Sequence, residues 1–297
     1  MLKFDPHRSA MERSFSLRAF NQYETEINKH FWSFKVVSDY AGYIARNERR
    51  KNPEYRTSKA FHASGPDAER IPPTVTEWLE AREELENWLR MSALVSAASY
   101  YEAYLRQIAR SALMASPLLR IGSPRLLEGT VLLKAGKEIP FTQELEMITK
   151  GDWNTRAANF VKLFGKPHSG SPFPITDLER IRKIRNDFAH GFGRALEPPG
   201  PSIGRIEPAR RLGQKKLIEY VAALSISASK IDRYLLPAFI GNFELIHCYH
   251  LWKKAPAIGK DASFDEPRRF QRHLNGTIGF TINRQFCRDL IAFYNAA

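Results

Sequence analysis

The sequence predicts an all-α fold: a bundle of four to five helices that carries an extension at each end. Apolar residues recur at spacings of three and four over long stretches, as they do in amphipathic helices that pack against one another. Stretches in which apolar and polar residues alternate are scarce, so strands are not expected. The 297 residues are 43% hydrophobic and 12% aromatic, a composition that supports a substantial core. Together these observations favour packed helices.

The N-terminal part of the chain is expected to form one long helix over residues 14–50. Its apolar face recurs at helical spacing and comprises Phe20, Tyr23, Ile27, Phe34 and Ala41. The helix ends in a basic cluster formed by Arg46, Arg49, Arg50 and Lys51. Such a run is usually a solvated face, and phosphate contact is the alternative. Residues 52–72 are polar and contain glycine and proline, so they predict a linker.

A second long helix is expected from about residue 74 to residue 115. Its start is marked by Pro73 and by a capping box, in which Thr74 and Glu77 exchange side-chain and backbone hydrogen bonds. The first turns are acidic and amphipathic, whereas the half after Met91 is apolar on several faces and is expected to be buried. Glu102 lies in that half. We expect it either to lie at the edge of the buried face or to be paired with a neighbouring arginine; the alternative is that its carboxylate faces a functional site.

The segment that follows is predicted to hold shorter elements. The stretch TVLLKAGKEI suggests a small hairpin that turns at Ala135-Gly136. A short helix is expected over residues 142–150. Asp152 is expected to start the next helix and Gly165 to end it.

The last part of the domain is predicted to be a core helix over residues 210–236, which Pro237 ends. A loop rich in glycine and proline at 191–206 precedes it, either as a lid or as a flexible excursion. An amphipathic terminal helix is expected from about residue 282. The chain thus divides into an N-terminal extension with its linker, a helical domain and a C-terminal extension, at residues 1–72, 73–240 and 241–297.

The net charge of +13 favours an anionic partner, most simply nucleic acid, over a merely soluble basic surface. Residues 176–240 hold 12 Lys and Arg against 7 Asp and Glu, whereas residues 76–110 hold 4 against 6. Cys248 and Cys287 are isolated, which gives no disulfide framework and fits a reducing cytosol. The N-terminus has no apolar signal region, and no run of about 18 apolar residues occurs. A cytoplasmic protein that does not span a membrane is therefore expected.

The segment 175–193, ITDLERIRKIRNDFAHGFG, is predicted to be an amphipathic helix. Thr176 and Glu179 form a second capping box, and Gly191 supplies the stop. The apolar stripe comprises Leu178, Ile181, Ile184 and Phe188. At 100° per residue, the opposite face comprises Glu179, Lys183, Asn186 and His190. One side of the helix is expected to pack, and the other to present a cationic, titratable surface.

This helix carries an Arg-Asn-x-x-x-His motif, formed by Arg185, Asn186 and His190. The looser pattern of Arg followed by His after four to six residues also occurs at 56–62 and 268–273, but only this copy has Asn after Arg and lies in a capped core helix. The alternative is structural: a protonated His190 at the end of a helix meets the negative end of the helix dipole.

The motif and two flanking segments resemble the HEPN superfamily of small helical ribonucleases and toxin or defence proteins. The flanking segments are YYEAYLRQIA and WNTRAANFVKLFG, and the resemblance covers roughly residues 75–240. It implies that Arg185 and His190 are the catalytic pair and that a polar residue, here Asn186, follows the arginine. It also implies a homodimer in which two motif helices face one another, with an antitoxin or regulatory protein as a further partner. The two extensions depart from the minimal family pattern.

RNA cleavage explains why these residue types occur together. RNA supplies its own nucleophile, the 2′-hydroxyl, so the reaction needs no metal or other cofactor, only a base, an acid and cationic donors. His190 suits proton transfer, Arg185 can offer paired donors to phosphate, and Asn186 can orient the histidine. The residues expected to hold RNA are Lys183, Arg182 and Arg180. The alternative function is a catalytically silent helical module that binds nucleic acid or a partner protein.

A second cluster, His247-Cys248-Tyr249-His250 with Cys287, contains residue types that bind zinc. Its spacing matches no standard zinc motif, so a buried cysteine among aromatic neighbours is favoured and no metal site is predicted. The sequence contains no phosphate-loop, nucleophile-elbow or dinucleotide-binding signature.

Overall fold

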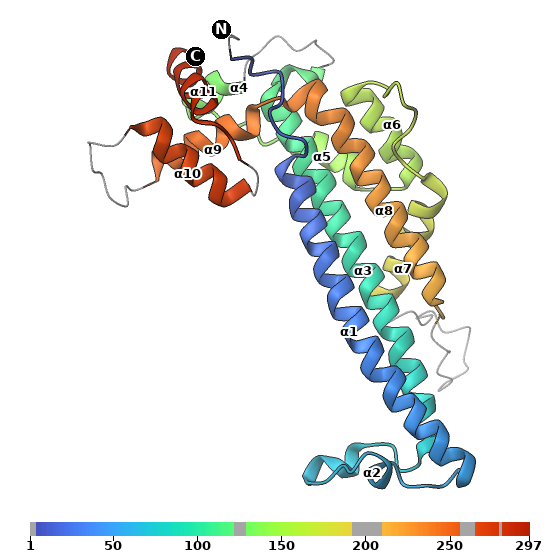
Figure 1. The fold of residues 1–297 in the computed structure, drawn as a ribbon. Helices are drawn as coiled ribbons and strands as arrows, with labels where there is room; N and C mark the ends of the chain where they lie inside the picture. Colours follow the sequence, from blue (N-terminus) through green and yellow to red (C-terminus); the bar gives the residue numbers. More distant parts are fainter. Residues whose placement is uncertain (1–3, 122–128, 192–209, 256–264, 279–280) are drawn as a thin grey trace. The chain divides into compact units, whose positions relative to one another are not determined.

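The chain folds into helices (Figure 1). A computed structural model describes residues 4–121, 129–191, 210–255, 265–278 and 281–297. The α-helices are α1 (Phe15–Lys51), α2 (Thr57–Ala60), α3 (Val75–Ala115), α4 (Gly129–Lys134), α5 (Thr142–Thr149), α6 (Trp153–Phe164), α7 (Ile175–Gly191), α8 (Gln214–Leu235), α9 (Phe243–Lys254), α10 (Glu266–Ile278) and α11 (Arg284–Ala296). Shorter helical turns are η1 (Pro66–Arg70), η2 (Pro117–Ile121) and the π-helical η3 (Leu236–Ile240). Within the described ranges, extended pairing is limited to one isolated bridge between Arg56 and Thr74, so the predicted all-α class is confirmed.

The structure divides into two compact units, and each is built from several parts of the sequence. The terminal unit comprises Met1–Phe20, Tyr101–Ile175 and Ile226–Ala297, and the hairpin unit comprises Asn21–Tyr100 and Thr176–Ser225. Helices α1, α3 and α8 each contribute a stretch to both units. The division of the chain into three consecutive segments stays a prediction.

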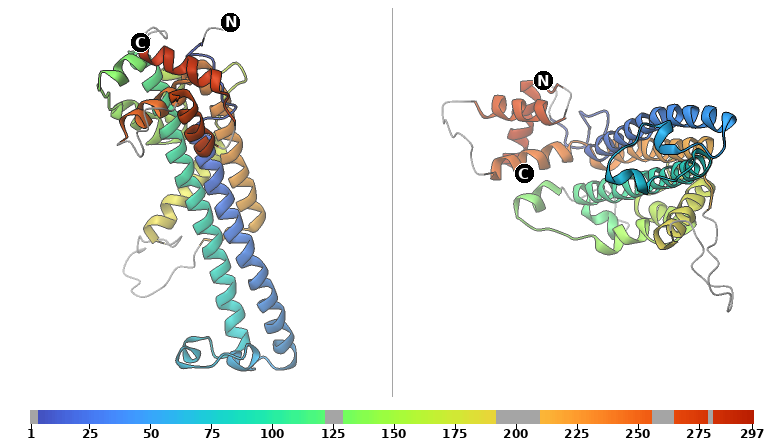
Figure 2. Two further views of the ribbon diagram at one scale, coloured as in Figure 1. Left: turned by 60° about the vertical axis from the view of Figure 1, so that its left-hand side comes forward. Right: turned by 90° about the horizontal axis from the view of Figure 1, so that it is seen from below.

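In the hairpin unit, α1 and α3 run side by side in opposite directions (Figures 1 and 2). The Arg82 guanidinium of α3 donates to the backbone carbonyl and the hydroxyl of Ser38 at 2.9 and 2.8 Å, and to Glu86 at 2.6 Å. Elsewhere along the pair, the rings of Tyr23 and Tyr100 stack with their centroids 4.5 Å apart. The two helices are therefore joined by specific polar and aromatic contacts as well as by apolar packing.

Helix α3 starts and continues as its sequence predicts. The Thr74 N–H donates to the Glu77 carboxylate at 3.2 Å, and the Glu77 N–H donates to the Thr74 hydroxyl at 3.3 Å, which is the expected capping box. Farther along, Leu94, Leu105 and Ile108 are at most 1% exposed, in agreement with the apolar composition of this half.

The segment 52–72, predicted as a linker, contains α2 and η1. Its two ends are joined by backbone hydrogen bonds, from Thr57 to the Pro73 carbonyl and from Val75 to the Tyr55 carbonyl, each 3.0 Å long. These hydrogen bonds between the two ends order the segment into a closed turn.

The core of the terminal unit is aromatic. The Tyr101 hydroxyl of α3 is hydrogen-bonded to the Ser227 hydroxyl at 2.6 Å, and the Tyr104 hydroxyl donates to the Ala228 carbonyl at 2.8 Å. Phe20 of α1 contacts both tyrosine rings. Because a buried hydroxyl needs a partner, these two hydrogen bonds also fix the register of α3 against α8.

Residues 130–139, predicted as a hairpin, instead form most of α4 and a tight turn. The Lys137 N–H donates to the Leu132 carbonyl at 3.0 Å, and Gly136 adopts a φ of 66°, a pattern that ends helices. The hairpin prediction was wrong because packing overrides the β propensity of this apolar run. An added Cβ at Gly129 would lie 2.0 Å from a backbone carbonyl of α3, so α4 begins in direct backbone contact with α3.

The α8 helix ends before Pro237, as predicted, but the chain continues through the π-helical η3 to Gly241. Gly241 adopts a φ of 57°, and an added Cβ would lie 2.4 Å from the Pro6 carbonyl oxygen, so glycine is required. The Asn242 amide donates to the Asp5 and Arg8 carbonyls at 2.9 and 2.6 Å. This corner therefore holds the N-terminal segment in place.

The remaining predicted helices are present as α5, α6 and α11. Asp152 caps α6 by accepting from the Thr155 N–H at 3.0 Å, and Gly165 ends the helix with a φ of 78°. Among the helices that the structure describes, none combines the length and the apolar character needed to cross a membrane.

Candidate active site on helix α7

Helix α7 buries the apolar stripe that its sequence predicts. Leu178, Ile181 and Ile184 are at most 2% exposed, and Phe188 is partly exposed. Three buried aliphatic side chains on consecutive turns fix which face of the helix points into the hairpin unit. The polar residues of α7 must therefore lie on its outer side and margins.

The motif residues lie in the C-terminal half of α7. Lys183 is exposed, and Arg185 and Asn186 are partly exposed. The backbone of His190 belongs to the last turn of the helix, whereas its side chain lies outside the part of the chain that the structure describes. Arg185 and Asn186 thus each keep part of their surface exposed in the C-terminal half of the helix.

Two of the three residues predicted to hold RNA take part in ion pairs within α7. Arg182 donates to the Glu179 carboxylate at 2.5 and 3.0 Å, and Arg180 lies 3.9 Å from the Asp177 carboxylate. The predicted capping box was wrong: α7 begins at Ile175, so Thr176 lies inside the helix, and the Glu179 carboxylate faces Arg182 in the next turn. Such partly exposed pairs are worth about 0–1 kcal/mol, so phosphate oxygens can compete for the arginines. Lys183 forms no ion pair with a described residue.

The chain returns beside α7 at a well-anchored point. Residues 192–206 of the predicted lid lie outside the described residues. Beyond them, the Arg210 guanidinium lies 3.3 Å from the Asp187 carboxylate of α7. Asn87 of α3 accepts from the Leu212 N–H at 2.8 Å and donates to the Arg210 carbonyl at 2.9 Å. Helix α3 therefore fixes the end of this segment and adds a further cation, Arg210, next to α7.

Arg156 has a role that the sequence did not reveal. It lies in the WNTRAANFVKLFG segment, is 4% exposed, and holds its guanidinium 3.1 Å from the Glu102 carboxylate and 4.6 Å from the Trp153 ring centroid. The expectation that an arginine satisfies Glu102 is confirmed. A guanidinium this deeply buried and already paired belongs to the packed interior of the terminal unit. The available signal was the i, i+3 spacing of Trp and Arg beside an apolar stripe.

Two members of the predicted cluster near the C-terminus, Cys248 and His250, contact other side chains. His250 Nδ1 is hydrogen-bonded to the Tyr294 hydroxyl at 2.6 Å, and Cys248 Sγ lies 3.9 Å from His273 Nε2. Burial raises the pKa of the Cys248 and Cys287 thiols to about 11, which keeps them protonated at neutral pH. Over the described ranges, no three His, Cys, Asp or Glu residues lie together in a way that could hold a metal ion.

Comparisons of the chain with protein-family models, curated proteins and solved structures found no match. The resemblance to the HEPN superfamily accordingly rests on the Arg185, Asn186 and His190 motif and on the two flanking segments.

Proposed function

We propose that this protein is a metal-independent endoribonuclease of the HEPN type, which cleaves RNA by attack of the ribose 2′-hydroxyl. The observation that supports this most directly is the orientation of α7, which buries its aliphatic stripe and leaves Arg185 and Asn186 partly exposed near its C-terminal turn. In this proposal the protein acts in the cytoplasm as a toxin or as an antiviral defence effector. Its net charge of +13 supports an anionic substrate.

Each motif residue has a defined chemical task. His190 is the general acid and base, because an imidazole exchanges protons near neutral pH. Arg185 stays charged and offers two parallel donors to the phosphate as negative charge develops on it. Asn186, four residues before His190, orients the imidazole.

Helix geometry favours a homodimer with a composite site. Arg185 and His190 are five residues apart, which places them about 7.5 Å apart along the axis and about 140° apart around it. One copy therefore holds Arg185 and His190 on different sides of the helix, and its single imidazole cannot serve both the attacking and the departing oxygen. A two-fold axis beside the end of α7 would bring the arginine and histidine of each copy to the same scissile phosphate, with one histidine for each departing or attacking oxygen.

The test is RNA cleavage by the purified full-length protein in the presence of EDTA. We expect fragments that end in 2′,3′-cyclic phosphate. Arg185→Ala and His190→Ala should each lower the rate by about a hundredfold or more. The exposed residues Arg233 and His168 provide matched controls, and Arg233→Ala and His168→Ala should cleave at the wild-type rate. Cleavage that EDTA abolishes, or that persists at full rate in His190→Ala, would contradict the proposal.

The dimer is tested separately by mixing the two inactive variants. A mixed dimer of Arg185→Ala with His190→Ala retains one arginine and one histidine, so partial activity should appear on mixing. The two variants must first be unfolded and refolded together so that subunits exchange. If the mixture stays inactive while chromatography shows mixed dimers, the composite site is wrong even if the ribonuclease proposal holds.

A different surface, on α1, favours a second candidate function. In this alternative the protein is a catalytically silent module that binds a partner protein. Trp32, Val36, Tyr40 and Tyr43 of α1 are 41%, 70%, 67% and 59% exposed. They fall within about 80° of one another around the helix, so they form one apolar stripe. A basic run follows the stripe, which suits an amphipathic partner helix with acidic flanks.

Variants of the α1 stripe and of His190 distinguish the two functions. Val36→Glu with Tyr40→Glu should abolish binding of such a helix and leave RNA cleavage unchanged, because neither residue belongs to α7. In the silent module, wild type and His190→Ala should bind RNA equally and cleave none. Chelator-resistant cleavage that requires His190 would exclude the silent module.

A further inference from the structure

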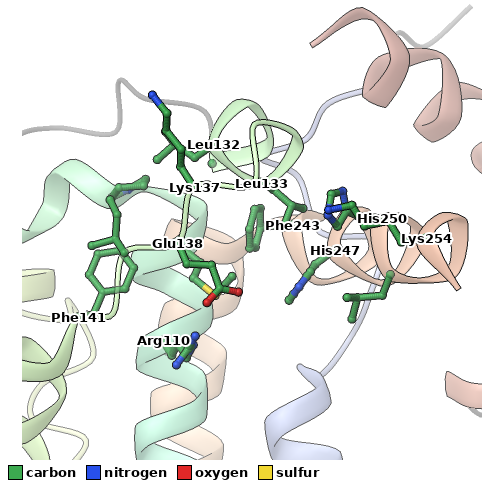
Figure 3. Close-up of a pocket in the computed structure, with 16 residues that line it drawn as sticks. Arg110, Leu132, Leu133, Lys137, Glu138, Phe141, Phe243, His247, His250 and Lys254 are labelled. Atoms are coloured by element: carbon green, nitrogen blue, oxygen red, sulfur yellow. The ribbon is translucent and has the colours of Figure 1, made fainter.

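A cavity in the terminal unit has no role in the proposed nuclease. It lies between the end of α3, α4 with the turn that follows it, and α9 (Figure 3). Its volume is about 270 Å³. An engineered apolar cavity of about 150 Å³ holds benzene, so this cavity has room for an organic molecule of roughly ten non-hydrogen atoms.

Most of the cavity wall is apolar. Its main hydrophobic lining residues are Met114, Leu132, Leu133, Phe141 and Phe243. Phe141 and Phe243 are at most 3% exposed, so they belong to the packed core and do not move freely at a rim. A wall of this kind favours an apolar ligand body, because burial of that body removes hydrocarbon surface from water.

Polar side chains gather at one part of the wall. Figure 3 shows Arg110 of α3, Glu138 and His247 of α9 turned toward one another, whereas Lys137 turns outward. Within the described part of the chain, Arg110 and His247 make no hydrogen bond or ion pair, so their donors are available to a ligand. His250, by contrast, is held in place by the Tyr294 hydroxyl at 2.6 Å.

The charges of these groups favour an anion. Arg110 is always protonated, and Lys254 at the same cavity adds a second cation, against the single carboxylate of Glu138. Burial, with the charge of Arg110 as a smaller cause, lowers the pKa of His247, so its imidazole is neutral at pH 7 and can still donate one N–H. A guanidinium can bind a carboxylate through two parallel hydrogen bonds.

We propose that this cavity binds a small amphipathic carboxylate. Its apolar body of about ten non-hydrogen atoms lies between α4 and α9, and its carboxylate binds Arg110 and His247. The site belongs wholly to the terminal unit and does not depend on the nuclease proposal. For a ligand of this size, a dissociation constant on the order of 1 mM or below is expected.

The probes are octanoate and cinnamate, with octanol and cinnamyl alcohol as neutral controls of the same shape. Binding to the full-length chain is measured by calorimetry and by ligand-observed NMR. Both carboxylates should bind, and the alcohols should bind about tenfold more weakly or not at all. Equal binding of alcohols and carboxylates, or no binding of either carboxylate at several millimolar, would overturn the proposal.

Substitutions in the cavity wall test whether octanoate binds there, because they should change its affinity in different directions. Arg110→Gln should weaken octanoate binding about tenfold or more, whereas Glu138→Gln should tighten it, because a repelling and competing carboxylate is removed. Leu133→Trp should block binding by filling the cavity.

Arg106→Gln is the control, since Arg106 is an exposed arginine of α3 outside the cavity, and it should leave the affinity for octanoate unchanged. Both Arg110 and Glu138 are exposed, so their variants should fold normally. If Arg110→Gln binds octanoate like the wild type, the assignment fails.

Discussion

At the residue scale, two buried carboxylates hold the start of helix α1. Asp232 accepts hydrogen bonds from the N–H and the hydroxyl of Ser14, and Glu244 accepts from the Phe15 N–H at 2.8 Å and from the Ser111 hydroxyl at 2.9 Å. These carboxylates satisfy N–H groups at the positive end of α1. Desolvation nevertheless dominates, and it raises the pKa of Asp232 and raises the pKa of Glu244 to about 7.

The raised pKa of Glu244 makes stability depend on pH in an unusual direction. Its pKa is higher in the folded protein than its ordinary value of 4.5, so folding favours the protonated form. The stability that this proton contributes is fully present below pH 4.5 and is lost as pH rises through about 7. Relative to Glu244→Gln, the free energy of unfolding of the wild type should therefore fall by about 3 kcal/mol between pH 4.5 and about pH 8.

Denaturant unfolding of both proteins across this pH range measures the difference. The exposed Glu12 supplies the control, since Glu12→Gln should follow the wild-type pH profile. Parallel profiles for the wild type and Glu244→Gln would show that Glu244 does not titrate differently on folding.

The buried Arg156 makes a second prediction at the residue scale. Arg156→Met removes the cation 3.1 Å from Glu102 and should lower the free energy of unfolding by about 3 kcal/mol, because a largely buried carboxylate loses that partner. The double variant Arg156→Met with Glu102→Met should recover part of this loss. A thermodynamic cycle of the four proteins measures the coupling. If the double variant is as unstable as the sum of the single variants, the ion pair contributes nothing specific.

At the element scale, helix ends are set by local chemistry that substitution can test. Gly165 ends α6 with φ 78° and ψ 175°, a region that residues with a Cβ avoid. Gly165→Ala should therefore lower the free energy of unfolding by about 2 kcal/mol. The exposed Gly276 lies inside α10 with no heavy atom within 4 Å of an added Cβ, so Gly276→Ala should raise it by about 0.5 kcal/mol. Thermal unfolding should show a lower Tm for Gly165→Ala and a higher Tm for Gly276→Ala than for the wild type. Tm changes of the same sign in both variants would contradict this explanation.

At the scale of the whole molecule, the net charge of +13 suits the anionic substrate that the proposed function requires, and that function makes a prediction about salt. A protein that neutralises four phosphates of a single strand releases about three counterions, because each phosphate contact contributes about 0.7 to the slope of log affinity against log salt. Under the proposed function, affinity for a short single-stranded RNA should fall about fiftyfold between about 50 and 200 mM salt. Fluorescence anisotropy with the inactive His190→Ala measures it without cleavage. Affinity that does not change with salt would show that phosphates are not contacted.

The predicted elements that the structure confirms are those with strong local signals. The capping box of Thr74 and Glu77, the Asp152 cap of α6 and the Gly165 stop depend on residues within three or four positions of each other, so the sequence alone identified them. The Thr176 box was wrong although its spacing is the same, because Glu179 binds Arg182. Local spacing thus predicts where caps can form, and the other hydrogen-bond partners of each side chain determine which caps do form.

For the candidate site, the sequence identified the helix, its buried stripe and the motif at residues 185–190, since these follow from periodicity along one element. It did not identify the pairing of Arg182 with Glu179, nor the approach of Arg210 to Asp187. The first depends on which rotamers the packed helix allows, and the second on where a distant segment returns. The cavity beside Arg110 was equally invisible, because its walls come from three separate elements.

The sequence by itself determined that this chain is helical, where most of its helices begin and end, and which faces of them are apolar, because these properties depend on near neighbours. Only the tertiary structure decided which partners satisfy the buried charges. Arg156 and Glu102 are 54 residues apart, and Phe15 and Glu244 are 229 residues apart. No local pattern specifies such pairs, since they form only when the chain closes around a shared core and every buried polar group must find a partner there.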